Sequence, residues 1–178
     1  MPPGLRFDAD AADCRVFTYR DGLLSMVAHD LELRVTRLTV EVDEAARTVA
    51  ATVDPTSLRV VQALRDGRPL PDALGANDRA QIERSIAGDV LQAARFPEIR
   101  FVSTAVADAP GGFRVTGTLV LCGREQTVVV PVRRDGNVAV AEATLHQPDF
   151  GIRPYSAMLG ALRVKPDVAV RLTVRRPS

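Results

Sequence analysis

Few side chains in this sequence could perform catalysis, and their spacing does not bring them together. The chain has only two histidines. His29 is followed by Asp30, so it could act as a base oriented by a carboxylate, with Ser25 or Ser156 as the nucleophile. The sequence contains no Gly-x-Ser-x-Gly, His-Glu-x-x-His, Cys-x-x-Cys or glycine-rich phosphate-binding motif. A hydrolase that uses His29 is therefore an alternative, and a protein that is not an enzyme is the prediction.

The residues that could bind a metal are equally scattered. His29, His146 and Cys122 could in principle gather around an ion, but their spacing matches no known ligand pattern. We predict no metal site and no other cofactor. Cys14 and Cys122 each fall within an expected strand, and buried free thiols are favoured there over a disulfide.

Composition limits the classes of partner. The chain has 178 residues, of which 46% are hydrophobic and 25% charged, and this length suits one domain over residues 1–178. Lys and Arg total 23 against 22 for Asp and Glu, so the net charge of +1 gives no electrostatic attraction to nucleic acid. No stretch approaches the roughly 18 to 20 apolar residues of a membrane span, and the first residues do not resemble a secretion signal. We expect a cytoplasmic protein without an integral membrane segment; whether it forms a homodimer is left open.

A β-hairpin within residues 96–132 organises the expected fold. Hydrophobic and polar residues alternate strictly over 113–121, and a second run rich in Val and Thr covers 125–132. Cys122 to Arg124 join the two runs and include a glycine, which indicates an antiparallel hairpin. Two strands alone are not stable, so the hairpin must belong to a larger sheet.

A long strand with a sharp bend is expected before this hairpin. Apolar residues alternate over 31–35, and the alternation slips by one residue before it resumes over 38–42. Such a slip would place the apolar side chains of the second half on the opposite face of the sheet, unless a bulge or bend absorbs one residue near Thr36 or Arg37.

The whole pattern indicates an all-β, antiparallel fold of about eight strands, enough to close into a barrel without exposed edges. A barrel is favoured and a two-sheet sandwich is the second choice. The other expected strands are 15–19, 49–53, 58–61, 138–145 and 168–174, and 62–76 is expected to be a surface loop.

Two helices are expected. One is an insertion at about 77–92, because Asp78 and Gln81 resemble a capping box and apolar residues recur at intervals of four. Those apolar residues are Ile82, Ile86 and Val90. The second is a short helix at about 154–162, where Pro154 suits the first position and the apolar spacing is i, i+3, i+4 and i+7. This segment could complete the core as a plug or cover the mouth of the barrel.

Four segments of the sequence resemble the YceI-like, polyisoprenoid-binding family. Phe96–Thr104 resembles its aromatic-Pro-x-Ile-x-Phe-x-Ser segment, and Val115–Val128 resembles its central hairpin. Asp149–Ile152 matches its Asp-Phe-Gly-Ile turn, and Val27–His29 resembles its early histidine segment. The four stand in the family's order and cover nearly the whole chain.

This resemblance implies a lipocalin-like, eight-stranded antiparallel β-barrel whose apolar interior holds a long isoprenoid chain, such as a prenyl quinone or another apolar lipid. The function implied is non-enzymatic binding, storage or transport of that lipid. The alternative is a barrel filled by its own side chains, which acts as a protein-interaction or stress-response module. The predicted ligand-binding residues are Met26, Val27, His29, Leu31, Phe101, Leu119, Leu121, Phe150, Ile152, Tyr155, Met158, Leu159 and Leu162. Candidate partners for a polar head group are His29, Asp30, Arg153 and Tyr155.

Overall fold

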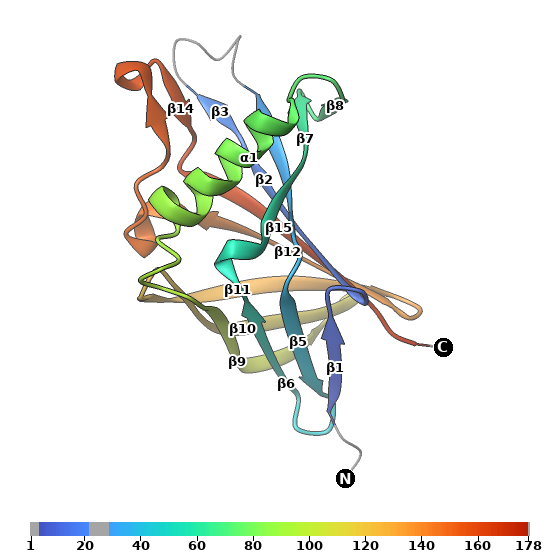
Figure 1. Cartoon of the computed structure of the whole chain (residues 1–178). Helices are drawn as coiled ribbons and strands as arrows, with labels where there is room; N and C mark the ends of the chain where they lie inside the picture. Colours follow the sequence, from blue (N-terminus) through green and yellow to red (C-terminus); the bar gives the residue numbers. More distant parts are fainter. Residues whose placement is uncertain (1–3, 22–28, 178) are drawn as a thin grey trace.

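The computed structural model describes residues 4–21 and 29–177, apart from the side chain of Met158. Its strands (Figure 1) are β1 (Leu5–Asp8), β2 (Ala12–Thr18), β3 (Arg20–Asp21), β4 (Asp30–Val35), β5 (Leu38–Asp43), β6 (Thr48–Val53), β7 (Leu58–Arg65), β8 (Arg68–Leu70), β9 (Ile99–Ala109), β10 (Gly112–Leu121), β11 (Arg124–Asp135), β12 (Val138–His146), β13 (Ser156–Ala157), β14 (Leu162–Val164) and β15 (Asp167–Arg175). The α-helix is α1 (Ala76–Ser85), which continues as a π-helical turn, η2 (Ile86–Val90). Three 3₁₀ turns complete the list: η1 (Pro55–Ser57), η3 (Gln147–Phe150) and η4 (Met158–Gly160).

Twelve of the strands form one antiparallel sheet, as the alternation in the sequence predicted. Their order is β1-β5-β6-β9-β10-β11-β12-β15-β2-β4-β7-β8, so in this order the sheet is open and ends at β1 and β8. A closed barrel of eight strands is not confirmed. The number of strands exceeds the prediction because bends divide several long runs, as between β4 and β5. The predicted hairpin of β10 and β11 is confirmed, with Leu121 paired to Arg124 across the turn.

The bend between β4 and β5 lies at Thr36 and Arg37, where the sequence predicted it. Ser57, which is fully buried, links it to the neighbouring chain. The Arg37 backbone N–H donates to Ser57 Oγ (3.0 Å), and that hydroxyl donates to the Asp54 carbonyl (2.7 Å). The Thr36 N–H donates to the Ser57 carbonyl (3.0 Å). These bonds satisfy the backbone groups that leave the ladder at the bend.

The charged groups of this corner are also paired. The Arg37 guanidinium donates from Nε to Asp54 Oδ2 (2.8 Å), and the Thr56 hydroxyl donates to Asp54 Oδ1 (2.6 Å). The hydrogen bond from Thr56, supported by Arg37, holds the pKa of the Asp54 carboxyl below its usual range. The corner is therefore fixed by both neutral and charge-assisted hydrogen bonds.

The helix covers the edge of β7. Gly75 precedes α1 as its N-cap, and the Asp78 carboxylate accepts from the Gly75 N–H (3.0 Å), so Asp78 is the third helical residue and not the cap itself. Glu83 accepts from the Val60 N–H (2.9 Å) and Arg79 donates to the Val61 carbonyl (3.0 Å). Two helical side chains thus satisfy groups of β7 that no further strand pairs with. The predicted helical insertion at about 77–92 is confirmed as α1 with η2.

Two predictions about irregular segments were wrong. The expected loop at 62–76 contains the end of β7 and all of β8, joined by a turn at Asp66 and Gly67, both with positive φ. The expected helix at about 154–162 is instead the hairpin of β13 and β14, which pairs with β3 in a separate three-stranded sheet. Leu159 has a φ of 56° at the tip, which ends any helix there.

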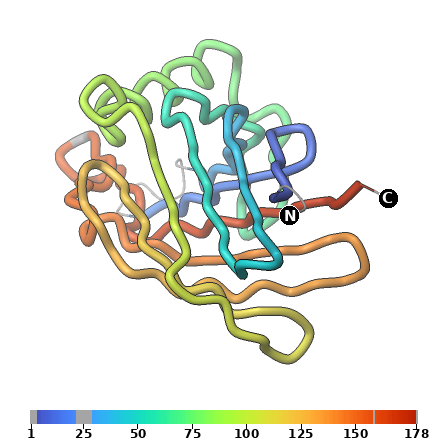
Figure 2. The backbone as a smooth tube through the Cα atoms, turned by 90° about the horizontal axis from the view of Figure 1, so that it is seen from below, coloured from blue at the N-terminus to red at the C-terminus, as the bar shows by residue number. Residues whose placement is uncertain are grey.

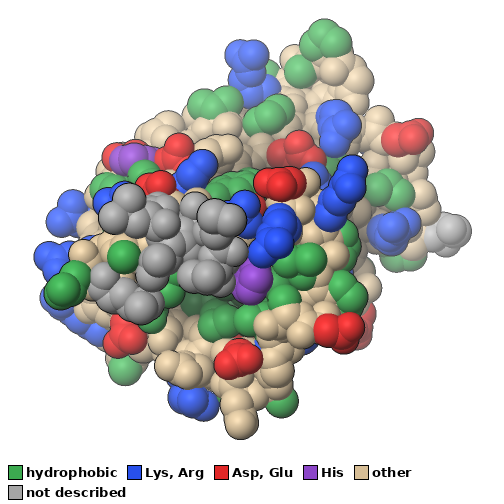
Figure 3. All heavy atoms as spheres, turned by 90° about the horizontal axis from the view of Figure 1, so that it is seen from above, with side chains coloured by type: hydrophobic (Ala, Val, Ile, Leu, Met, Phe, Trp, Pro, Cys, Tyr) green, Lys and Arg blue, Asp and Glu red, His purple; other side chains and the backbone are tan. Residues whose placement is uncertain are grey.

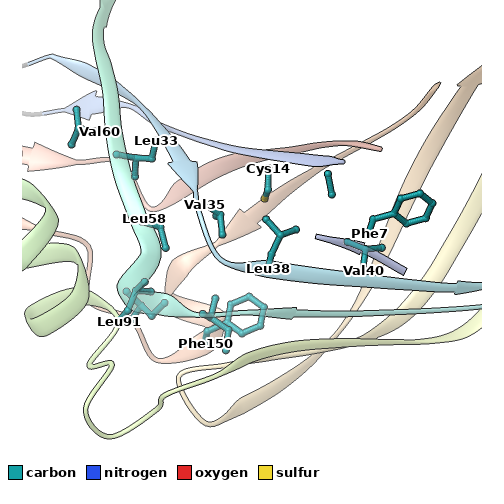
Figure 4. Close-up of a cluster of buried hydrophobic side chains, with 13 residues drawn as sticks. Phe7, Cys14, Leu33, Val35, Leu38, Val40, Leu58, Val60, Leu91 and Phe150 are labelled. Atoms are coloured by element: carbon teal, nitrogen blue, oxygen red, sulfur yellow. The ribbon is translucent and has the colours of Figure 1, made fainter. Parts of the chain in front are cut away.

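Seen from below, the α1 side of the molecule lies opposite the β9–β10 hairpin (Figure 2). The best-packed core lies near the bend, where side chains from β1, β2, β4, β5 and β7 meet (Figure 4). Its members include Phe7, Cys14, Leu33, Val35, Leu38, Val40 and Leu58. In the described part of the chain no helix combines the length and apolar character that crossing a bilayer requires.

Candidate ligand-binding cavity

A large apolar cavity lies between the sheet and α1. Its volume is about 1080 Å³, just above the usual range of roughly 300 to 1,000 Å³ for pockets that enclose a small ligand. Aliphatic side chains from the inner faces of the strands make most of its wall, and Ile82, Ile86 and Val90 face it from the helical segment. The stripe of residues four apart, which predicted an amphipathic helix, therefore closes the cavity from one side.

The wall formed by β9 to β12 and β15 leaves much of the interior hollow, although Val115 and Leu121 of β10 are buried. Phe101, Leu119, Val130 and Val170 all line the cavity, yet each remains only half-buried. Inward side chains that filled the interior would be fully buried at the packing density of protein cores. These side chains therefore border empty space, and the interpretation of a barrel filled by its own residues does not fit this geometry.

Small residues in the wall either leave more volume in the cavity or allow a neighbouring side chain to pack against the strand. Ala139, Ala141 and Ala143 line the cavity from β12, where longer side chains would reach across it. Gly117 on β10 serves a different purpose, because a Cβ atom there would lie 2.4 Å from Cζ of Phe101. Gly117 thus lets the Phe101 ring rest against β10.

The structure brings together most of the predicted ligand-binding residues. Those that line the cavity are His29, Leu31, Phe101, Leu119, Leu121, Phe150, Ile152, Tyr155 and Leu162. Leu121, Phe150 and Ile152 are buried and pack with Leu91, so they form a closed part of the wall. Contact of any of these residues with a ligand stays a prediction.

Of the four other predicted residues, Leu159 is the one whose side chain the structure describes, and it does not line the cavity. Leu159 is fully exposed at the tip of the β13–β14 hairpin, because the segment is not the helix that would have turned it inward. Met26 and Val27 lie outside the described residues, and the side chain of Met158 is not described.

Sequence reasoning missed several cavity residues although their signal was visible. Leu33 and Val35 line the cavity beside Leu31, and the alternation over 31–35 had placed the three on one face. Val168, Val170, Leu172 and Val174 line it from β15 for the same reason. The period of two identifies such a face, but it does not say whether the face meets a cavity or a core.

Polar groups with incomplete hydrogen bonding lie where β3 and β4 border the cavity. Arg20 and His29 both line it, and Arg20 Nη1 and His29 Nδ1 are buried without a hydrogen-bond partner. The Asp30 carboxylate accepts from the Arg20 backbone N–H (2.8 Å). Because His29 Nδ1 has no partner, Asp30 does not orient it as the hydrolase alternative requires. Of the other head-group candidates, Tyr155 lines the cavity, whereas Asp30 and Arg153 are not among its lining residues.

At the turns after β5 and β11, two of the arginines that border the cavity are paired with carboxylates. Arg47 contacts Asp108 (2.9 Å) and Arg176 contacts Glu44 (3.0 Å). The Asn137 amide donates to the Arg176 carbonyl (3.3 Å). Arg47 and Arg176 are therefore paired with carboxylates at this end, whereas the exposed Arg134 donates to the Gly136 carbonyl (3.4 Å).

Both cysteines are free thiols, as predicted, and neither is activated. The prediction that each is buried within a strand is confirmed for Cys14 in β2 and wrong for Cys122, which is half-buried in the turn between β10 and β11. Burial, with a contribution from the charge of Asp13, raises the pKa of Cys14 to about 12. Burial also raises the pKa of Cys122, whose thiol donates to the Leu91 carbonyl (3.4 Å). Within residues 4–21 and 29–177, no three His, Cys, Asp or Glu side chains are grouped as metal ligands would be.

Comparisons with known proteins agree with this fold. The sequence model of the YceI-like domain matches residues 7–175. BcnA of Burkholderia cenocepacia has a similar structure, with a TM-score of 0.66, 19% sequence identity, and 96% of this chain and 99% of that chain covered. A polyisoprenoid binding domain from Saccharophagus degradans, implicated in plant cell wall breakdown, gives a TM-score of 0.60 at 12% identity, over 94% and 95% of the two chains. The YceI protein of Campylobacter jejuni gives 0.54 at 11% identity, over 82% and 85%. No curated protein matches the chain in sequence.

Proposed function

The chain belongs to the YceI-like domain family, and from this membership we propose that it binds a long apolar isoprenoid-like lipid in its cavity. The bound molecule would be stored or carried without chemical change. A prenyl quinone and a polyprenyl chain are both of this class. The similar domain from Saccharophagus degradans is described as polyisoprenoid-binding, which supports the choice of ligand class.

The observation that carries this proposal is the hollow aliphatic interior of about 1080 Å³. Transfer of hydrocarbon from water to an apolar site contributes roughly 0.8 kcal/mol per CH₂, so one five-carbon unit could contribute about 3 to 4 kcal/mol before ordering costs. A few isoprene units would therefore suffice for tight binding. Such a wall selects for length and girth, because one methylene more or less changes affinity only modestly.

The strand arrangement is compatible with a lipocalin-like barrel around this ligand. We count β1 with β2, β4 with β5, and β6 with β7 as single bent strands, which gives eight strands with β9 to β12 and β15. Ladders between β2 and β15, β2 and β4, β5 and β6, and β6 and β9 support this count. A wall of that kind would surround a chain-like ligand along its length.

Organic extraction and mass spectrometry of the purified protein test the proposal. We expect a stoichiometric prenyl or other long-chain species that is absent from an unrelated protein purified in the same way. An Ala143→Phe variant should lose this species because the ring would occupy the cavity, whereas Thr144→Phe, on an exposed residue of the same strand, should keep it.

The proposal fails if nothing co-purifies and an added prenyl quinone neither binds nor raises the melting temperature, since a ligand specific to the folded state must stabilise it. Equal loss of lipid in both Phe variants would also count against the cavity as the binding site.

A further inference from the structure

Two polar atoms at one end of the cavity are buried without a partner. They are Arg20 Nη1 and His29 Nδ1, and both residues belong to the cavity wall. A buried polar group without a hydrogen bond costs folding free energy, so such groups often mark a site that a ligand completes. The third atom of this kind among the described residues, Arg34 Nε, does not border the cavity, and it lies 3.3 Å from the Asp13 carboxylate.

The backbone holds Arg20 and His29 close to each other. Arg20 lies on β3 and pairs with Val164 of β14, while His29 directly precedes β4. The Asp30 carboxylate accepts from the Arg20 N–H at 2.8 Å, which ties the start of β4 to β3. The backbones that carry the two unpartnered side chains are therefore joined through Asp30.

The charge of Arg20 is only weakly compensated. Its Nη2 lies 3.7 Å from Asp66, whose side chain is 84% exposed, so this pair is largely screened by water. Arg163 also borders the cavity here, and its nearest carboxylate, that of Asp21, is 3.8 Å away. The surface at this end carries side chains of both signs (Figure 3).

We propose that Arg20 and His29 form a subsite for the head group of the bound lipid, and that this head group presents oxygen atoms as hydrogen-bond acceptors. The inference rests on the function proposed above. A guanidinium has donors and no acceptor, and the imidazole donates from Nδ1 in the tautomer that carries its hydrogen there. A phosphate and a quinone carbonyl share this acceptor chemistry. Phosphate gains more, because Arg20 and Arg163 are cations.

The subsite also sets the direction of the ligand. The polar groups at the opposite end, Arg47 and Arg176, already contact carboxylates at about the distance of a hydrogen bond. Arg134 also borders the cavity there, but it is exposed to water. Among the described residues, the polar atoms of the cavity wall that are buried without a partner are those of Arg20 and His29. The head group therefore lies between β3 and β4, and the hydrocarbon extends along the aliphatic wall toward the turns after β5 and β11.

Binding of three probes that share a fifteen-carbon chain tests this assignment. The probes are farnesyl phosphate, a farnesyl-substituted benzoquinone and the hydrocarbon farnesane, titrated calorimetrically into the full chain. Arg20→Met, which keeps the length of the side chain but removes its donors, should weaken phosphate binding about tenfold or more. We expect a smaller loss for the quinone and less than about a twofold change for farnesane. His29→Phe should weaken both oxygen-bearing probes and leave farnesane unchanged.

Arg6→Met is the matched control, because Arg6 is exposed, pairs with Glu41 on the outer surface and changes the net charge equally. It should not alter any of the three affinities. Unchanged farnesane binding shows that a variant is still folded.

Equal binding of all probes to the wild type, or equal losses in Arg20→Met and Arg6→Met, would overturn the head-group subsite alone. Failure of every probe to bind the wild type would overturn the proposed function itself. A loss confined to the phosphate or to the quinone would support the subsite and identify which oxygen it recognises.

Discussion

The walls on the two sides of the cavity are built from similar aliphatic residues, but they are packed very differently. On the β4–β5 side, Leu33 and Val40 are each 2% exposed and belong to one tight cluster (Figure 4). On the β9–β15 side, Phe101, Leu119 and Val170 face the same interior but remain half-buried. Hydrophobicity and alternation are alike on the two sides, so they do not decide which wall packs.

The backbone makes this difference. The bend at Thr36 and Arg37 brings β1, β2, β4, β5 and β7 close enough for their side chains to interdigitate. Strands β9 to β12 and β15 are longer, and Leu119 and Val170 pack only against the border of that cluster, where they stay half-buried. We infer that the packed wall contributes most of the folding free energy, while the hollow wall provides space for the ligand.

The largest expected effect comes from truncation of the same residue type on both walls. Leu33→Ala should lower the free energy of unfolding by about 3 kcal/mol, because it removes a fully buried side chain and leaves a void. Leu119→Ala should cost about 1 kcal/mol, since the cavity already borders that side chain. Urea denaturation of the ligand-free variants measures both. Equal losses would show that the two walls are equally packed.

Enlarging a small residue should also cost more stability on the packed wall than on the hollow wall. Ala12, which is 1% exposed, has no room for a larger side chain, so Ala12→Leu should destabilise the protein by about 2 kcal/mol. Ala141→Leu on the hollow wall should change stability by less than about 1 kcal/mol but reduce lipid binding. Thermal unfolding and lipid titration of the two variants separate these effects. If Ala141→Leu were as destabilising as Ala12→Leu, the wall would not be hollow.

Hydrogen bonds to serine hydroxyls allow a subtler comparison. Ser57→Ala should cost about 1 to 2 kcal/mol, because the fully buried Ser57 hydroxyl no longer bonds to the Arg37 N–H and the Asp54 carbonyl at the bend. Ser103 accepts from the Val49 N–H (2.8 Å) beside the hollow wall, at a half-buried position. Ser103→Ala should cost less, since water can replace the lost acceptor. Denaturant titrations of the two variants measure the free energies of unfolding. A larger loss in Ser103→Ala than in Ser57→Ala would contradict this comparison.

The smallest effect is the pH dependence that Asp54 adds to the bend. Its pKa is lower in the folded protein than in the unfolded chain, so it stabilises the fold above the unfolded value of about 3.9. That contribution is lost as the pH falls through the folded pKa. Asp54→Asn should therefore be less stable than the wild type at neutral pH, and the difference should shrink below about pH 4. A constant difference across that range, measured by denaturation at several pH values, would exclude this role.

Local sequence patterns predicted the elements whose structure depends on neighbours in the chain. The hairpin of β10 and β11, the bend at Thr36, and α1 each follow from alternation, a phase slip or a spacing of four. The β13–β14 hairpin was mistaken for a helix because Tyr155, Leu159 and Leu162 also fit a helical spacing. Its pairing with β3, more than 130 residues earlier, overrides that local preference. The Asp66–Gly67 turn was a visible hairpin signal that was interpreted as a loop.

The candidate site was also predictable only in part, because contacts between segments distant in sequence place some of its residues. Alternation identified inward residues such as Leu31 and Phe101, and the resemblance to a family indicated which chemistry they would serve. Arg20 was missed because a charged residue at the end of a short strand is usually solvated. Its place in the cavity wall depends on Asp30 and on β14, neither of which a local pattern reveals.

The three-stranded sheet of β3, β13 and β14 has consequences for how quickly a ligand can leave. Its ladders contain only two residue pairs each, so few hydrogen bonds must break for it to open. Native proteins open in separate units, and the least stable unit exchanges its amide hydrogens fastest. We expect the amides of β13 and β14 to exchange much faster than those of β10 and β11, and bound lipid to slow that exchange. The rate at which the lipid dissociates would then be set by this local opening, whereas the rate of global unfolding would be set by the packed wall.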